Sequence, residues 1–134
     1  MRVAKHLLAA TGVLTAAALS AGIGISLGLG IFGVFLGPGW PSYDWAFVGA
    51  SAFGGCLAGL LTAVVFRTRS IVFATAGPAL FWSLLLLSPN PWLWRMPLVW
   101  AEATIAVGSA AVAWWIAKRL TARPGRSVRR TLAR

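Results

Sequence analysis

The sequence predicts an all-α integral membrane protein, with four transmembrane helices in an antiparallel bundle and a basic cytoplasmic tail. Of 134 residues, 59% are hydrophobic and only 10% are charged, and the mean hydropathy of +0.82 is far above what a soluble core needs. The apolar residues form four long runs, and the twelve Lys and Arg residues stand at their ends or in the C-terminal tail. These observations exclude a soluble domain and a disordered chain, and the single cysteine excludes a disulfide scaffold.

The first apolar run covers residues 7–36 and contains no charged side chain. As one straight helix it would be about 45 Å long, whereas the hydrocarbon core of a bilayer is about 30 Å thick. Its second half is rich in glycine, which weakens a helix unless a neighbour packs closely. We therefore expect a kinked or closely packed segment there, ending at the turn formers Gly37-Pro38-Gly39.

The start of this run also has features of a secretory signal peptide. Arg2 and Lys5 precede an apolar stretch, and residues 18–21 have the small side chains of a cleavage site. Because the apolar stretch continues past that point without interruption, we expect an uncleaved first span.

Three further spans follow from the remaining runs. The second ends at the short turn Arg67-Thr68-Arg69-Ser70, so the next helix returns beside it. The third contains Pro78, which is expected to kink it, and the Thr75 hydroxyl is a candidate partner for the freed carbonyl. The fourth begins at Pro97, a favourable first helical residue. The sequence thus divides into a transmembrane domain over 1–117, with spans at about 7–36, 46–66, 71–87 and 97–117, and a tail over 118–134.

The distribution of basic residues predicts the orientation. With four spans, one side of the membrane holds eleven of the twelve Lys and Arg residues, and the other holds only Arg95. By the positive-inside rule both termini lie in the cytoplasm, and the protein is a multi-pass protein of the inner or plasma membrane. Trp114 and Trp115 then mark the inner interface of the last span.

The chain lacks the residues that enzyme chemistry requires. His6 is the only histidine and lies at a membrane boundary, and Cys56 stands alone in an apolar run, where a small packing residue is expected. Glycine is abundant, but no phosphate-binding loop with a Gly-Lys-Ser or Gly-Lys-Thr ending is present. We predict that the protein is not an enzyme and uses no cofactor or metal ion.

Small residues recur at helical spacing in two of the predicted spans. Ser51, Gly55 and Gly59 are four residues apart, as are Gly24 and Gly28. Such spacing places small side chains on one face of a helix and lets a second helix approach closely. Packing within the monomer is favoured over a dimer interface, because a four-helix bundle must also pack its own helices.

Glu102 is the only acidic residue inside a predicted span. It lies roughly 7 to 8 Å below the outer end of the fourth helix, and Ala106, Ser109 and Ala113 share its side. A carboxylate facing lipid is unfavourable, so Glu102 is expected to face the bundle. It is either an ion or proton site, or a structural carboxylate that is paired with Arg95 or solvated near the interface.

The basic tail is predicted to contact anionic lipid headgroups. It has seven basic residues and no aromatic side chain for base stacking, which disfavours nucleic acid as its partner. The residues expected to make these contacts are Lys118, Arg119, Arg123, Arg126, Arg129 and Arg130.

Two function classes agree with these features. The first is a non-enzymatic accessory or interaction subunit that uses its helix faces to bind other membrane protein subunits or a second copy. The second is a small oligomeric transporter or channel that uses Glu102 as a proton or cation site. In size and number of spans the chain resembles the small multidrug-resistance transporters, but their essential glutamate lies in the first helix, which here has none. The accessory subunit is preferred because it requires no residue that the sequence lacks.

Overall fold

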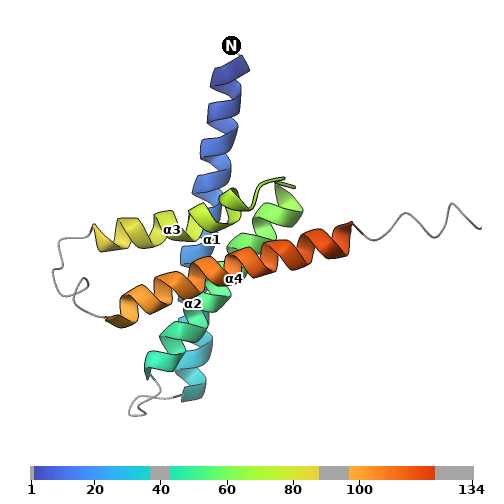
Figure 1. Cartoon of the computed structure of the whole chain (residues 1–134). Helices are drawn as coiled ribbons and strands as arrows, with labels where there is room; N and C mark the ends of the chain where they lie inside the picture. The colour runs from blue at the N-terminus through green and yellow to red at the C-terminus, as the bar shows by residue number, and fades with distance from the viewer. Residues whose placement is uncertain (1, 37–42, 88–96, 123–134) are drawn as a thin grey trace, which may run out of the picture.

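The computed structural model describes residues 2–36, 43–87 and 97–122, which form four α-helices (Figure 1). Helix α1 covers Arg2–Leu36, α2 covers Tyr43–Leu60 and continues as a π-helical turn, η1, over Leu61–Val65, α3 covers Ile71–Leu86, and α4 covers Pro97–Thr121. Three helical segments are long and apolar enough to cross a membrane, namely Val3–Ile31, Ala46–Val65 and Pro97–Thr121. The chain is therefore an all-helical protein with the helices of a membrane protein.

Helix α3 is shorter than the other three. Its 16 residues extend about 24 Å, which is less than the hydrocarbon thickness of about 30 Å. Pro78 lies inside it and is buried. The Thr75 hydroxyl donates to the carbonyl oxygens of Ile71 and Val72, so the expectation that it satisfies the carbonyl freed by Pro78 is wrong. The carbonyl freed by Pro78 is that of Ala74, directly before Thr75 in the chain. A threonine hydroxyl in a helix reaches the carbonyls three and four residues earlier more easily than that of the preceding residue.

Helix α1 is continuous, and its two halves have different surroundings. Most of the N-terminal half, which we call the free half of α1, stands clear of the other helices (Figure 1). Val3, Leu7 and Leu8 are exposed there, and only near its end does Ala17 pack against Gly77 of α3. The glycine-rich half packs closely on α2, with Gly24 against Gly54. Of the two expectations for this segment, close packing is the one that the structure shows.

Each helix has two close neighbours, in the circular order α1, α2, α4, α3. Gly24 lies opposite Gly54 and Gly28 opposite Ala50, so α1 and α2 are antiparallel. By contrast α2 and α4 run in the same direction, and so do α1 and α3, although α3 crosses α1 steeply (Figure 1). Gly55 and Gly59 lie opposite Ala106 and Ala110, in the same order along α2 and α4, and Ala17 and Gly22 lie opposite Gly77 and Phe81, in the same order along α1 and α3. The fold is therefore two antiparallel hairpins, α1–α2 and α3–α4. Where the hairpins meet, α1 contacts α3 and α2 contacts α4, and each pair runs in the same direction.

The turn between α2 and α3 is fixed by several hydrogen bonds. Arg67 has a left-handed backbone with φ 49°, which ends the helix. The backbone N–H and the hydroxyl of Thr68 both donate to the Thr62 carbonyl, each at 3.0 Å. Ser70 then caps α3 by accepting from the Val72 N–H at 3.3 Å. The turn therefore has a defined conformation that directs α3 back along the bundle.

Candidate functional site

The small residues of α2 form its contact with α4. A Cβ atom added at Gly55 would overlap the Ala106 carbonyl and the Ser109 hydroxyl, and one added at Gly59 would overlap the Ala110 carbonyl. At these points no side chain separates the two backbones, which is the close approach that small residues permit in membranes. Gly55 and Gly59 of the predicted stripe thus lie at a helix contact within the chain, and Ser51 of the same stripe is buried.

The small residues of α1 form a second contact of the same kind. A Cβ atom at Gly24 would lie 2.6 Å from the Gly54 Cα, and one at Gly28 would lie 2.8 Å from the Ala50 Cα. Helix α2 is therefore packed closely on both sides, against α1 through Gly54 and against α4 through Gly55. Two adjacent glycines serve two different neighbours because successive residues in a helix point about 100° apart.

Glu102 is buried inside the bundle with an exposed fraction of 5%. It shares its face of α4 with Val99 and Ala106, which belong to the hydrophobic core. Gly55 of α2 lies opposite Ala106 of α4, and the two helices run in the same direction. One turn earlier on each helix, Ser51 of α2 is therefore level with Glu102 of α4. The only acid of the predicted spans thus faces inward, at the level of the Ser51 hydroxyl.

A second buried polar group comes from α3. Trp82 belongs to the same core cluster as Val99 and Ala106. Among the described residues, neither the Ser51 Oγ nor the Trp82 Nε1 has a hydrogen-bond partner, although both atoms are buried. We call Ser51, Trp82 and Glu102 the buried polar layer, since they bring polar side chains from three helices into the core. A shallow groove of about 320 Å³ between α3 and α4 reaches this layer at Trp82.

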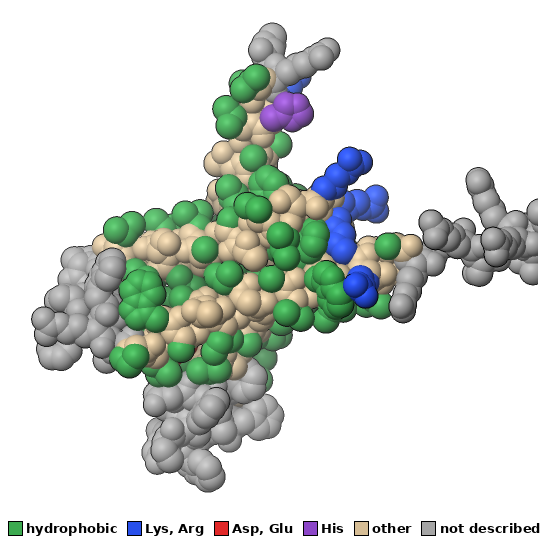
Figure 2. Space-filling model, in the orientation of Figure 1, with side chains coloured by type: hydrophobic (Ala, Val, Ile, Leu, Met, Phe, Trp, Pro, Cys, Tyr) green, Lys and Arg blue, Asp and Glu red, His purple; other side chains and the backbone are tan. Residues whose placement is uncertain are grey.

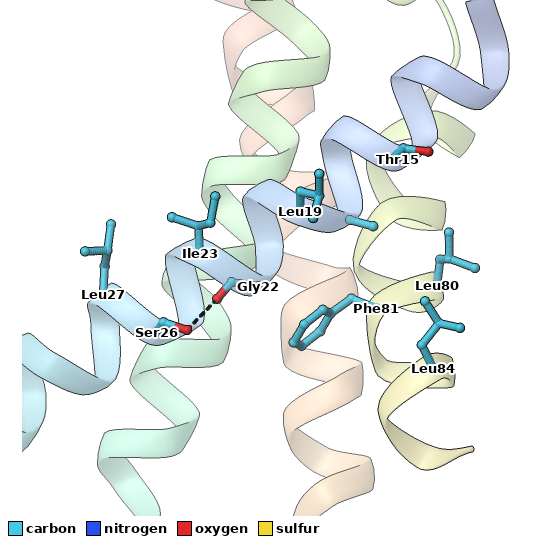
Figure 3. A pocket seen from close by; sticks show the side chains of 10 residues that line it. Thr15, Leu19, Gly22, Ile23, Ser26, Leu27, Leu80, Phe81 and Leu84 are labelled. Carbon is cyan, nitrogen blue, oxygen red and sulfur yellow. Dashed lines mark hydrogen bonds between the residues drawn. The ribbon is translucent and has the colours of Figure 1, made fainter. Parts of the chain in front are cut away.

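An open groove lies between α1 and α3, where these helices diverge (Figure 3). It has a volume of about 690 Å³ and is almost entirely apolar. Its floor on α1 carries small residues four positions apart, Ala18, Gly22 and Ser26, and Phe81 of α3 points toward Gly22. The rims carry exposed larger side chains, namely Leu19, Ile23 and Leu27 of α1 and Leu80 and Leu84 of α3.

Basic side chains gather where the α2–α3 turn meets the end of α4 (Figure 2). The indole Nε1 of Trp114 donates to the Thr68 hydroxyl at 3.3 Å and so joins the turn to α4. The Lys118 Nζ lies 5.8 Å from the centre of the Trp114 ring, and the Arg119 Cζ lies 4.0 Å from that of Trp115. Both distances are in the range of cation–π interactions.

Several predicted contacts fall outside the residues that the structure describes. These are the tail residues Arg123, Arg126, Arg129 and Arg130, and Arg95, the expected partner of Glu102. Of the predicted headgroup contacts, Lys118 and Arg119 are described. Over residues 2–36, 43–87 and 97–122, no group of three or more His, Cys, Asp or Glu side chains is placed to hold a metal ion.

Comparison with known proteins finds no match among family models, curated proteins or solved structures. The arguments on function therefore rest on this chain alone. Sequence reasoning missed the groove and the link between Thr68 and Trp114. The four-residue spacing of Ala18, Gly22 and Ser26 in the sequence could have indicated the groove floor. The link could not be predicted in this way, because Thr68 and Trp114 are far apart in the sequence.

Proposed function

We propose that this protein is a non-enzymatic accessory subunit that binds one transmembrane helix of a larger membrane complex in the groove between α1 and α3. The observation that carries the proposal is the groove itself, about 690 Å³ of apolar space above small residues at four-residue spacing. A small-residue floor lets the backbone of a second helix come close, and this contact drives helix association in lipid. An acyl chain gains no comparable advantage from such a floor.

The free half of α1 supports the same function. Residues at the start of this helix extend beyond the other three helices, and Leu8 is 78% exposed. A partner helix in the groove would continue along this part of α1 and cover it. The groove and the free half of α1 would together form one continuous contact surface.

Site-specific photocrosslinking tests this proposal. A photoreactive residue in place of Ile23, on the rim of the groove, should crosslink to a transmembrane segment of another protein in native membranes. The matched control is Val112 on α4, because Ile23 and Val112 are both 57% exposed. Ser26→Trp should abolish the crosslink, because the indole ring fills the groove. The fold should be retained, because the Ser26 hydroxyl bonds only within its own helix, to the Gly22 carbonyl. Crosslinks to lipid alone, or equal crosslinking from Val112, would contradict the proposal.

The proposed topology is four spans with both termini in the cytoplasm. The orientation rests on the eleven of twelve Lys and Arg residues that four spans place on one side. The number of spans is supported by the packing of α2 and α4, since two neighbours that run in the same direction cross the membrane in the same direction. The chain between them must then return across the membrane, and α3 is the segment that makes this return. A span as short as α3 is accommodated by local thinning of the bilayer or by the flanking residues.

Thiol labelling in a Cys56→Ala background tests the topology. A cysteine at Ser70 or Thr131 should react with an impermeant reagent only after the membrane is opened. Cysteines at Ser42 and Ser88 should react in intact cells. Labelling of Ser70 from outside would contradict the proposed orientation.

The buried polar layer favours a second candidate function, a small oligomeric transporter or channel that uses Glu102 as its proton or cation site. An intramembrane acid that faces the bundle interior is a common feature of ion pathways. In vesicles with an imposed pH gradient, this function predicts a protein-dependent flux that Glu102→Gln abolishes, because an amide does not release a proton. Thr121→Val is the control, because the Thr121 hydroxyl lies outside the buried polar layer and bonds only to carbonyls of its own helix. Absence of flux from the wild-type protein would favour the accessory subunit.

A further inference from the structure

The end of the molecule where the α2–α3 turn meets α4 has a concentration of positive charge with no nearby acid. Arg67, Arg69 and Lys118 lie around the link between Thr68 and Trp114, and Arg119 follows on the next face of α4. The chain has only two acidic residues. Asp44 is near the start of α2, and Glu102 is sixteen residues, or about 24 Å, before Lys118 along α4.

The backbone that carries these cations is held in place. Thr68 makes two hydrogen bonds to the Thr62 carbonyl and accepts a third from Trp114. Arg67 and Arg69 flank this fixed residue on either side. Holding like charges together without an acid is unfavourable, and an external anion offsets the repulsion. The arrangement therefore favours binding of a multivalent oxyanion such as a phosphate group.

Apolar side chains border the same cations. Val65 at the end of η1, Phe66 next to it and Val72 in the first turn of α3 are exposed large hydrophobic residues close in sequence to Arg67 and Arg69. A ligand with an anionic head and long apolar chains matches a cationic site that is bordered in this way. A free phosphate or a nucleic acid would leave the apolar border uncovered, and the Trp114 and Trp115 rings are already in contact with basic side chains.

We propose that Arg67, Arg69 and Lys118 form a binding site for the phosphate of one anionic phospholipid, whose acyl chains lie along the exposed apolar side chains beside the α2–α3 turn, namely Val65, Phe66 and Val72. The site is separate from the α1–α3 groove, so it does not depend on the proposed helix partner. It also differs from a general attraction of the tail to an anionic surface, because it gives the two turn arginines the main role.

Lipid binding to the full chain in a neutral detergent tests the proposal, since no charged surface is then present to attract the tail. The probe is phosphatidylglycerol, with phosphatidylcholine as the neutral comparison, and bound lipid is counted by native mass spectrometry. Arg67→Gln/Arg69→Gln should weaken phosphatidylglycerol binding by about tenfold or more, because hydrogen bonds between charged groups are lost. The matched control Arg126→Gln/Arg130→Gln removes the same charge from the tail and should change binding by less than about twofold.

Two further variants separate charge from the conformation of the turn. Arg67→Gly removes one cation but suits the left-handed backbone at φ 49°, so it should weaken lipid binding while thermal stability stays equal or rises. Trp114→Phe keeps a ring beneath Lys118 but removes the hydrogen bond to Thr68. It should weaken phosphatidylglycerol binding while all charges remain, because the turn is no longer held against α4.

Three results would overturn the proposal. Equal losses in the turn and tail double variants would show a general charge effect. Displacement of the lipid by millimolar inorganic phosphate would show a site for the free anion. Tighter binding to an RNA oligonucleotide than to phosphatidylglycerol at the same salt concentration would show a nucleic-acid surface.

Discussion

The two neighbours of α1 contact it in different ways. Toward α2, Gly24 and Gly28 face Gly54 and Ala50, and the two backbones touch. Toward α3, the close contacts are Ala17 with Gly77 and Gly22 with the ring of Phe81, and beside them the surfaces part to leave the groove. Both faces of α1 carry small residues at four-residue spacing. Such spacing therefore indicates which face of a helix allows close contact with another helix. It does not indicate whether another helix of the same chain packs on that face.

The difference depends on what the facing helix offers. Helix α2 has small residues of its own at the contact, so glycine meets glycine or alanine. Helix α3 has Phe81, whose ring lies against Gly22 and keeps the two backbones apart at this level. Side-chain size on the second helix thus separates a closed contact from an open groove.

The largest effect is expected in the contact between α2 and α4. Gly55→Val would place a branched side chain against the Ala106 carbonyl and the Ser109 hydroxyl, which the backbone cannot avoid. We expect a loss of about 3 kcal/mol or more in the free energy of unfolding, or failure to fold. Gly108→Val on α4 is the control, because a Cβ atom there would meet nothing within 4 Å. Denaturant titration in mixed micelles measures both variants, and equal stability would contradict the close packing.

The contact between α1 and α2 is expected to be nearly as sensitive. Gly24→Val would press against the Gly54 backbone, and we expect a loss of about 2 to 3 kcal/mol. Helix α1 has a free half and can shift, so the loss should be smaller than for Gly55→Val. Gly30→Val is the control on the same helix, since Gly30 has nothing within 4 Å of an added Cβ atom. The same titration measures both, and a larger effect at Gly30 would reverse the comparison.

The groove face should tolerate a similar change. A Cβ atom at Gly22 would lie 2.8 Å from the end of the Phe81 ring, and that ring can turn into the open groove. Gly22→Ala is therefore expected to change the free energy of unfolding by less than about 1 kcal/mol. If Gly22→Ala were as damaging as Gly24→Val, α1 and α3 would be packed as closely as α1 and α2.

The smallest effect is expected at the buried hydroxyl of Ser51. Its exposed fraction is 1%, and among the described residues its Oγ has no hydrogen-bond partner. Ser51→Ala should change stability by about 0.5 kcal/mol or less, or raise it, because no hydrogen bond is lost. Thr62→Val is the comparison: the Thr62 hydroxyl donates to the carbonyls of Ala58 and Gly59, so we expect a loss of about 1 kcal/mol. A large loss in Ser51→Ala would indicate a bound water or ion in the buried polar layer.

Hydrophobic length and breaker residues in the sequence determined the number of helices and most of their limits. The uninterrupted run after His6 is one helix, and the turn at residues 67–70 separates α2 from α3. The inward face of Glu102 also followed from the sequence, because a carboxylate in an apolar run has little choice of surroundings. These properties are local, or depend only on the contrast between polar and apolar groups.

Only the tertiary structure decided which helices are neighbours. The sequence predicts that consecutive helices are antiparallel, but the parallel pairing of α2 with α4 and of α1 with α3 depends on how two hairpins fit together. That fit brings Thr68 to Trp114 and Ser51 level with Glu102, and it leaves the α1–α3 groove open. The physical reason is that packing depends on the shapes of two surfaces at once, whereas a sequence pattern describes one helix at a time.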